Sequence, residues 1–254
     1  MTGILINARL GSTRLINKHL IKVNNRTLME WLLLRFLNTF KSLVLQKKVK
    51  LIIATSVKPE NEKFKELTKG IDVEVFYGND ENIPLRQIEC AKEYNLQKII
   101  SIDGDDILCS TEAALNIYNI LLNPNINIAK TTGLPLGMNV IGYRTEFLRK
   151  SLKSSESILE TGWGRIFNER EIIELVADKR NYDQLRFTLD YELDSKFFSA
   201  LIERTGDEII SISDPNLIDT VIKNKLYEIN NSLITEYWAN FNNQKEEETK
   251  QNNG

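Results

Sequence analysis

The sequence predicts an α/β protein with a mostly parallel central sheet flanked by helices. Short apolar runs with the length of buried strands alternate along the chain with longer segments whose apolar residues recur at helical spacing. Such alternation is typical of proteins whose strands lie parallel in one sheet. The chain has 254 residues, of which 42% are hydrophobic, so it is long enough to bury a full core. Neither a repeat nor a linker divides residues 1–241, which we expect to form a single domain.

The expected strands are short runs rich in β-branched and other apolar residues. They cover residues 4–6, 50–55, 73–77, 98–102, 127–131, 139–144, 172–176, 186–189 and 208–212.

The expected helices follow from apolar periodicity and from start signals. Thr27 and Glu30 have capping-box spacing before an apolar stretch, and Pro84 suits the first turn of a helix. The polar residues 242–254 cannot bury a face, so we expect a disordered tail there. The expected helices cover residues 28–37, 59–69, 84–95, 111–122, 146–153, 157–169 (interrupted by glycines at 162 and 164), 194–204 and 215–238.

Composition excludes several classes of function. The net charge of −2 and the pI near 5.7 give no general attraction to nucleic acid or to anionic membranes. No signal-peptide pattern opens the sequence, and no apolar run reaches the length of a membrane span. Cys90 and Cys109 lie in apolar contexts and are expected to be buried thiols, which indicates a cytoplasmic protein. His19 is the only histidine, which removes most of the triads and zinc clusters built on histidine, because no second histidine can complete them.

A cationic loop follows the first expected strand. Arg9, Arg14 and Lys18 supply positive charge, Ser12 supplies a hydroxyl, and Gly11 lets the chain turn tightly. Together these groups suit a polyphosphate, although a solvated basic loop has the same composition. The loop contains neither a P-loop motif nor a dinucleotide fingerprint.

Acidic residues follow two other expected strands. Asp103, Asp105 and Asp106 come after residues 98–102, and Asp190 comes after residues 186–189. Ligands of open α/β sheets bind at the carboxyl ends of the strands, where these carboxylates and the cationic loop should meet. Carboxylates together with substrate phosphates are the usual ligands of Mg²⁺, whereas an isolated aspartate can equally be a helix cap. A metal, cations and a positioned nucleophile suffice for phosphoryl-type transfer without a histidine base.

Three segments carry a family resemblance over about residues 3–205. The first, ILINARLGSTRLINKHL, resembles the opening of cytidylyltransferases that activate acidic sugars, the group of CMP-keto-deoxyoctulosonate and CMP-acylneuraminate synthetases and their spore-coat polysaccharide relatives. SIDGDD is similar to the metal loop of that family, and RFTLDYELD is similar to its second metal motif. Ile16 and Asn17 replace the usual Pro-Gly, Asp103 replaces the usual Gln or Thr, and residues 133–168 match poorly.

The resemblance implies a nucleotide-diphospho-sugar transferase (Rossmann-like) fold and a homodimer. It implies Mg²⁺ as the cofactor, CTP and a small anionic acceptor as partners, and pyrophosphate as the leaving group. It places Arg14, Lys18 and Asp105 in catalysis and the metal on Asp105 and Asp190. The implied nucleotide-binding residues are Ala8, Arg9, Leu10, Gly11, Ser12, Arg14, Lys18, Asp80, Arg86 and Asp103.

The acceptor is the least defined part of this hypothesis. Arg144, Trp163 and Arg165 are candidates for binding an anionic acceptor, with packing as the alternative role of Trp163. Three other functions remain open at this point. They are transfer to a phosphate or phosphonate acceptor, a non-catalytic nucleotide-binding role, and a glycosyltransferase that uses the D-x-D of residues 103–105.

Overall fold

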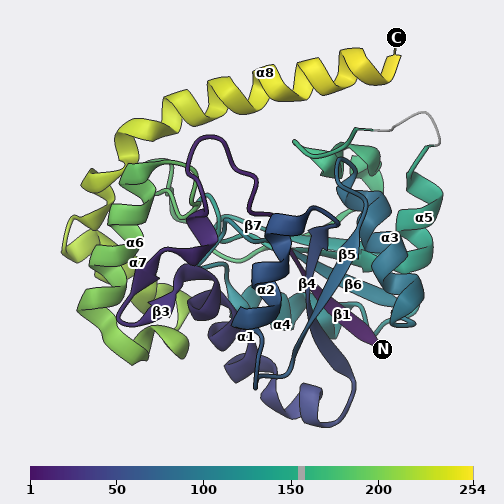
Figure 1. The fold of residues 1–254 in the computed structure, drawn as a ribbon, viewed down its shortest axis with the longest axis horizontal. Coiled ribbons are helices and arrows are strands. Elements are labelled where there is room, and N and C mark those ends of the chain that lie inside the picture. The colour runs from purple at the N-terminus through teal and green to yellow at the C-terminus, as the bar shows by residue number, and fades with distance from the viewer. Residues whose placement is uncertain (154–157, 254) are drawn as a thin grey trace.

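The computed structural model describes residues 1–153 and 158–253 and contains a seven-stranded mixed sheet (Figure 1). The strand order is β5-β4-β1-β6-β8-β7-β9. β1, β4, β5 and β6 are parallel, β8 runs antiparallel to β6 and β7, and β9 is parallel to β7. The predicted α/β class with a mostly parallel sheet is confirmed. The strands are β1 Thr2–Asn7, β4 Val49–Ser56, β5 Val73–Gly78, β6 Lys98–Asp103, β7 Ile128–Thr132, β8 Ile141–Arg144 and β9 Ile173–Val176, and β2 Lys22–Val23 forms a hairpin with β3 Arg26–Thr27.

Eight α-helices occur in the described part of the chain, joined in places by short 3₁₀ turns. The capping box at the start of α1 is present, because the Glu30 amide donates to the Thr27 hydroxyl and the Thr27 amide donates to the Glu30 carboxylate. None of these helices has the combination of length and apolar character needed to cross a membrane. The helices are α1 Leu28–Leu45, α2 Lys63–Leu67, α3 Ile83–Glu93, α4 Thr111–Ile120, α5 Thr145–Ser151, α6 Glu192–Thr205, α7 Asp214–Lys223 and α8 Ile234–Asn253.

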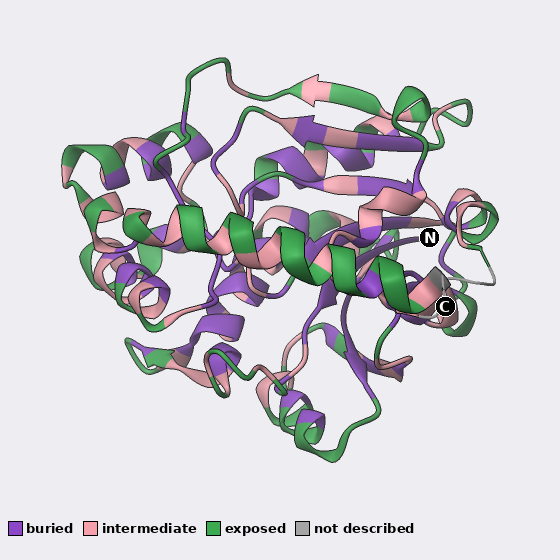
Figure 2. Ribbon diagram, turned by 90° about the horizontal axis from the view of Figure 1, so that it is seen from above, coloured by how far each residue is buried: buried purple, intermediate pink, exposed green. Residues whose placement is uncertain are grey.

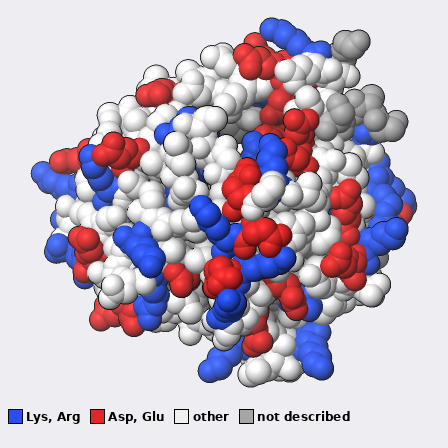
Figure 3. All heavy atoms as spheres, viewed as in Figure 1, with Lys and Arg blue, Asp and Glu red and all other residues white. Residues whose placement is uncertain are grey.

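Helices cover both faces of the sheet, which explains why its central strands are apolar runs without alternation. Ile4 and Ile6 of β1 pack in a core cluster that includes residues of α1, α4, α6 and α7. Leu5, between them, packs on the other face with residues of α3 and α5. All three side chains are fully buried. Most charged side chains lie at the surface, where Figure 3 shows both signs interspersed over one face of the molecule, whereas Arg35, Arg186 and Asp194 are fully buried.

Three expected elements are wrong. Residues 186–189 form no strand of the sheet, because the amide of Phe187 bonds to Leu136 and the amide of Leu189 bonds to Asp105, so this segment has no single partner strand. Residues 206–210 form a 3₁₀ turn where a strand was expected. Residues 158–169 form no α-helix. They contain the 3₁₀ turn Trp163–Ile166, which follows Gly162 in the left-handed region at φ +60°, and a second 3₁₀ turn begins at Glu169. The beginning of that expected helix, residues 154–157, lies outside the described residues.

The C-terminal residues also differ from expectation. Residues 242–253 continue α8, whereas a disordered tail was expected. The end of the helix is attached by polar bonds, since Asn252 exchanges two hydrogen bonds with the backbone of Ile158 and Glu248 accepts from the amide of Thr161. A polar sequence therefore becomes ordered here without an apolar face. Figure 2 shows α8 crossing the top of the molecule.

Candidate active site

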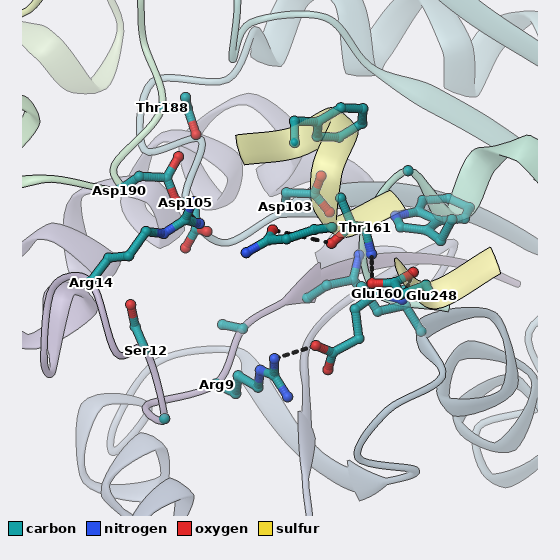
Figure 4. A pocket seen from close by; sticks show the side chains of 18 of the residues that line it. Arg9, Ser12, Arg14, Asp103, Asp105, Glu160, Thr161, Thr188, Asp190 and Glu248 are labelled. Carbon is teal, nitrogen blue, oxygen red and sulfur yellow. Dashed lines mark hydrogen bonds and ion pairs between the residues drawn. The ribbon is translucent and has the colours of Figure 1, made fainter. Parts of the chain in front are cut away.

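A cavity of about 730 Å³ lies at the carboxyl ends of β1 and β6. Most of its lining residues come from four parts of the chain that are distant in sequence. They are the loop after β1, the end of β6, residues 158–164 and the inward face of α8, and the remaining lining residues are Ile83, Arg86, Ile141, Thr188 and Asp190 (Figure 4). This is the edge of the sheet at which α/β proteins bind their ligands.

The loop after β1 is fixed at its base by buried polar groups. The sheet register pairs Asn7 with Asp103. The side-chain amide of Asn7 donates to the Ser101 hydroxyl and to the Ile102 carbonyl. The amide of Leu10 donates to Asn61 over 2.9 Å. Gly104 closes the gap between the two strand ends, because a Cβ there would lie 2.7 Å from the Ala8 Cβ and 2.9 Å from the Asn7 oxygen. The cationic loop and the acidic loop therefore lie in direct contact.

Lys18 joins the two predicted metal carboxylates. Its Nζ lies 2.6 Å from Asp105 Oδ2 and 3.3 Å from Asp190 Oδ1, and the lysine side chain is almost fully buried. Burial alone would lower the pKa of Lys18, but the charges of Asp105 and Asp190 outweigh burial and raise this pKa above its ordinary value. The Ile16–Asn17 replacement does not remove Lys18 from the site. Asn17 adopts the left-handed conformation at φ 53°, which asparagine tolerates, and Ile16 projects into solvent.

Asp105 is held as a charged carboxylate. Burial would raise its pKa, but Lys18 and His19 lower it well below the usual range. His19 Nε2 lies 3.0 Å from Asp105 Oδ1, so the single histidine orients a carboxylate. Asp106 lies outside the cavity lining, where the Thr188 hydroxyl bonds to its side chain.

Asp190 reaches the site from a loop that precedes α6. The amide of Leu189 bonds to the carbonyl of Asp105 over 2.9 Å, which brings the two acidic segments together. Arg186 donates to Asp190 over 3.0 Å and also makes a bidentate pair with Asp194, the residue whose carboxylate accepts from the Asp190 amide. Arg14 donates to Asp190 from the opposite side over 3.0 Å. The expected convergence of carboxylates is present, although Asp190 follows a loop and not a strand of the sheet.

The pair Asp105 and Asp190 suits Mg²⁺ only together with phosphate oxygens. Among the described residues, no group of three or more His, Cys, Asp or Glu side chains has the arrangement of a complete metal site. Both carboxylates contact the same cationic group, Lys18 Nζ, which shows that one cation can bridge them. Mg²⁺ commonly binds one or two carboxylates and completes its shell with substrate phosphates and water, so this donor set fits the metal.

Most of the predicted nucleotide-binding residues line the cavity, and two do not. Leu10 packs in the core, and Asp80 lies just outside the lining, where it pairs with Lys58 at 2.6 Å and with Arg9 at 3.8 Å. Arg86 lines the cavity and donates to the carbonyls of the turn at residues 79–80. The other lining members of the predicted set are Ala8, Arg9, Gly11, Ser12, Arg14, Lys18 and Asp103.

The predicted acceptor residues are only partly brought together. The prediction that Arg144 binds the acceptor is wrong. Its guanidinium donates to the carbonyls of Leu121, Asn123 and Ile126, away from the cavity. Arg165 is engaged with the Thr161 carbonyl and with Glu248 at 3.3 Å. Trp163 both lines the cavity and packs, with its ring 6.0 Å from that of Tyr143.

Sequence reasoning missed Glu160 and the whole wall formed by α8. Tyr237, Phe241, Gln244 and Glu248 recur at helical spacing on the inward face of this helix and line the cavity. The spacing of Tyr237 and Phe241 was the available signal. Glu160 carries no sequence signal, because its role depends on its partner Arg9 across 151 residues.

The comparison with known proteins identifies the family of this chain. Residues 3–183 match the family model described as cytidylyltransferase. The chain belongs to the cytidylyltransferase family. It is 31% identical over 152 residues to an uncharacterised protein of Methanocaldococcus jannaschii, and the match spans 60% of each sequence. This chain thus spans about 60% of the length of that curated relative.

Solved structures of cytidylyltransferases share the fold. A cytidylyltransferase from Leptospira borgpetersenii superposes with a TM-score of 0.76 at 23% identity, covering 89% of this chain and 95% of its own. A CMP:2-keto-3-deoxy-manno-octonic acid synthetase complexed with CTP has a TM-score of 0.56 at 14% identity, covering 80% and 98%. At these identities the likeness shows that the chain shares their fold, and no more than the fold. The α8 wall lies beyond the residues that the family model matches.

Proposed function

We propose that this protein is a Mg²⁺-dependent cytidylyltransferase that joins CMP from CTP to a small acceptor and releases pyrophosphate. The observation that carries the proposal is the meeting of Lys18 and Arg14 with Asp105 and Asp190 in one cavity. Cations and metal-binding carboxylates on the same rim are what nucleotidyl transfer needs. Membership of the cytidylyltransferase family supports CTP as the nucleotide.

In the proposed reaction, an acceptor oxygen attacks the α-phosphorus of CTP. The bond from this phosphorus to the bridging oxygen breaks, and pyrophosphate leaves with the electron pair. Arg9, Ser12, Arg14 and Lys18 bind the phosphates, and Lys18 and Arg14 stabilise the charge that develops on the leaving group. Asp105 and Asp190 would hold Mg²⁺, which would supply positive charge to neutralise the phosphates.

The proposed acceptor is a small acidic sugar, and its support is the sequence motif of the first loop. The expected cationic clamp does not add to that support, because Arg144 lies away from the cavity and Arg165 is paired with Glu248. The acceptor class therefore has to be measured with a panel of keto-acid sugars, sugar phosphates and phosphonates.

Pyrophosphate release by the full chain with CTP and Mg²⁺ tests the proposal. We expect release with one class of acceptor and a loss of at least about 100-fold in kcat for Asp105→Asn, the size typical of removing a charged group that stabilises a transition state. Asp72→Asn makes the same change at an exposed position and should leave kcat unchanged. No pyrophosphate with any acceptor, or full activity of Asp105→Asn, would contradict the proposal.

A further inference from the structure

All three cations of the loop after β1 are paired with carboxylates of the same chain. Lys18 and Arg14 contact Asp105 or Asp190, the proposed metal ligands. Arg9 instead donates to Glu160, which belongs to a different segment and has no part in the proposed reaction (Figure 4). Glu160 therefore needs a separate explanation.

The backbone around Glu160 is fixed on both sides of the residue. Leu159 is fully buried, and its amide and carbonyl bond to Glu81 and Ile83 over 2.8 and 3.0 Å. Trp163 is buried on the far side. The position of Glu160 is thus set by the fold, which directs its carboxylate into the cavity toward Arg9.

Helix α8 adds a second support to the same residue. Glu248 accepts hydrogen bonds from the amides of Glu160 and Thr161 over 3.3 and 2.8 Å, and it also pairs with Arg165. Glu248 is itself buried, at 9% exposure. A carboxylate from the C-terminal helix therefore holds the backbone that presents Glu160.

The contact between Glu160 and Arg9 resembles the contact that a phosphate would make. An arginine fork binds carboxylate and phosphate oxygens in the same geometry, so the two anions exclude each other from the same donors. Asp80, the other carboxylate near Arg9, lies farther away at 3.8 Å and is already paired with Lys58. A phosphate that binds the same nitrogen of Arg9, Nη2, must displace Glu160.

We propose that Glu160 is an internal competitor of the nucleotide phosphates for Arg9. This inference rests on the proposed function, because it takes Arg9 as a phosphate ligand. Glu160 lowers the affinity of the site for polyphosphate anions, and it pairs with Arg9 again as pyrophosphate departs. It is a specificity-determining residue, since a ligand without phosphates does not compete with it and is unaffected.

Binding measurements without an acceptor test this competition. The probes are CTP, inorganic tripolyphosphate and cytidine, titrated calorimetrically at one fixed ionic strength into the full chain and into Glu160→Gln. We expect Glu160→Gln to bind CTP and tripolyphosphate about tenfold more tightly, the change expected for losing one competing charge-assisted hydrogen bond. Cytidine should bind both proteins equally. Glu246→Gln, at an exposed position of α8, removes the same charge and should not change the affinities.

A second variant tests the support from α8. Glu248→Gln weakens the hold on residues 160–161 and should give part of the gain in CTP affinity, together with faster hydrogen exchange of the amides at 160 and 161.

Equal or weaker CTP binding by Glu160→Gln would overturn the competition. An equal gain in Glu246→Gln would point to net charge, and an equal gain for cytidine would point to general opening of the cavity, and either result overturns it as well. If the unmodified chain binds neither CTP nor tripolyphosphate, the proposed function fails first and this inference with it.

Discussion

Replacing Asp194 with alanine should destabilise the protein more than most single substitutions. Asp194 is fully buried, and its two oxygens accept five hydrogen bonds. Two come from Arg186, one each from the amides of Asp190 and Tyr191, and one from the side chain of Asn230. The substitution leaves the fully buried guanidinium of Arg186 with Asp190 as its remaining ion-pair partner.

The expected loss of unfolding free energy is about 3–5 kcal/mol, the range for removing one partner of a buried ion pair. The individual hydrogen bonds would each account for about 1–3 kcal/mol if left unsatisfied, but their effects are not additive within one network. A loss in this range is a large fraction of the stability of a typical domain.

Urea unfolding followed by circular dichroism at pH 7 measures this loss from the midpoint and the slope. Glu192→Ala removes an exposed carboxylate from the first turn of the same helix and should cost less than about 1 kcal/mol, as for surface charges generally. A loss below about 1 kcal/mol for Asp194→Ala would refute the inference that this buried network stabilises the fold.

Two further predictions concern other buried groups. Burial raises the pKa of Asp214, whose carboxylate accepts a hydrogen bond from Ser110, so its contribution to stability is largest in acid and is lost as pH rises through the folded pKa. Urea unfolding at two pH values should therefore show that Asp214→Asn costs less stability at pH 7 than at pH 4.5, and a larger cost at pH 7 would contradict this sign. Burial raises the pKa of both Cys90 and Cys109, so neither thiol should react with a disulfide reagent at pH 8 until denaturant is added. Rapid reaction of either thiol in the folded protein would contradict the burial of these two cysteines.

The central sheet could be predicted because its signals are local. The apolar run of β1 is buried on both faces, as its composition indicates, and Thr27 and Glu30 form the capping box that their spacing predicts. The meeting of Asp105 and Asp190 was also expected from their positions at the ends of apolar runs. Its cause was not, because residues 186–189 alternate apolar and polar side chains like a strand but bond to two separate segments.

The remaining site could not be predicted because its contacts are between polar groups far apart in sequence. Arg144 has the residue type of an anion ligand, yet three backbone carbonyls occupy its guanidinium. The end of α8 lacks an apolar stripe. It is attached instead by hydrogen bonds, in which Glu248 and Asn252 bind to backbone groups of residues 158–161. Periodicity detects apolar faces and does not detect helices attached by hydrogen bonds.

The docking of α8 bears on how the protein should be handled in the laboratory. Asn252, near the end of α8, bonds to Ile158, which lines the cavity. Met1 lies at the other end of β1, where its ammonium group contacts Gln97, about 20 Å along the strand from the rim. A bulky label attached at the end of α8 would therefore sit beside the cavity, whereas one attached at the start of β1 would lie at the far edge of the sheet.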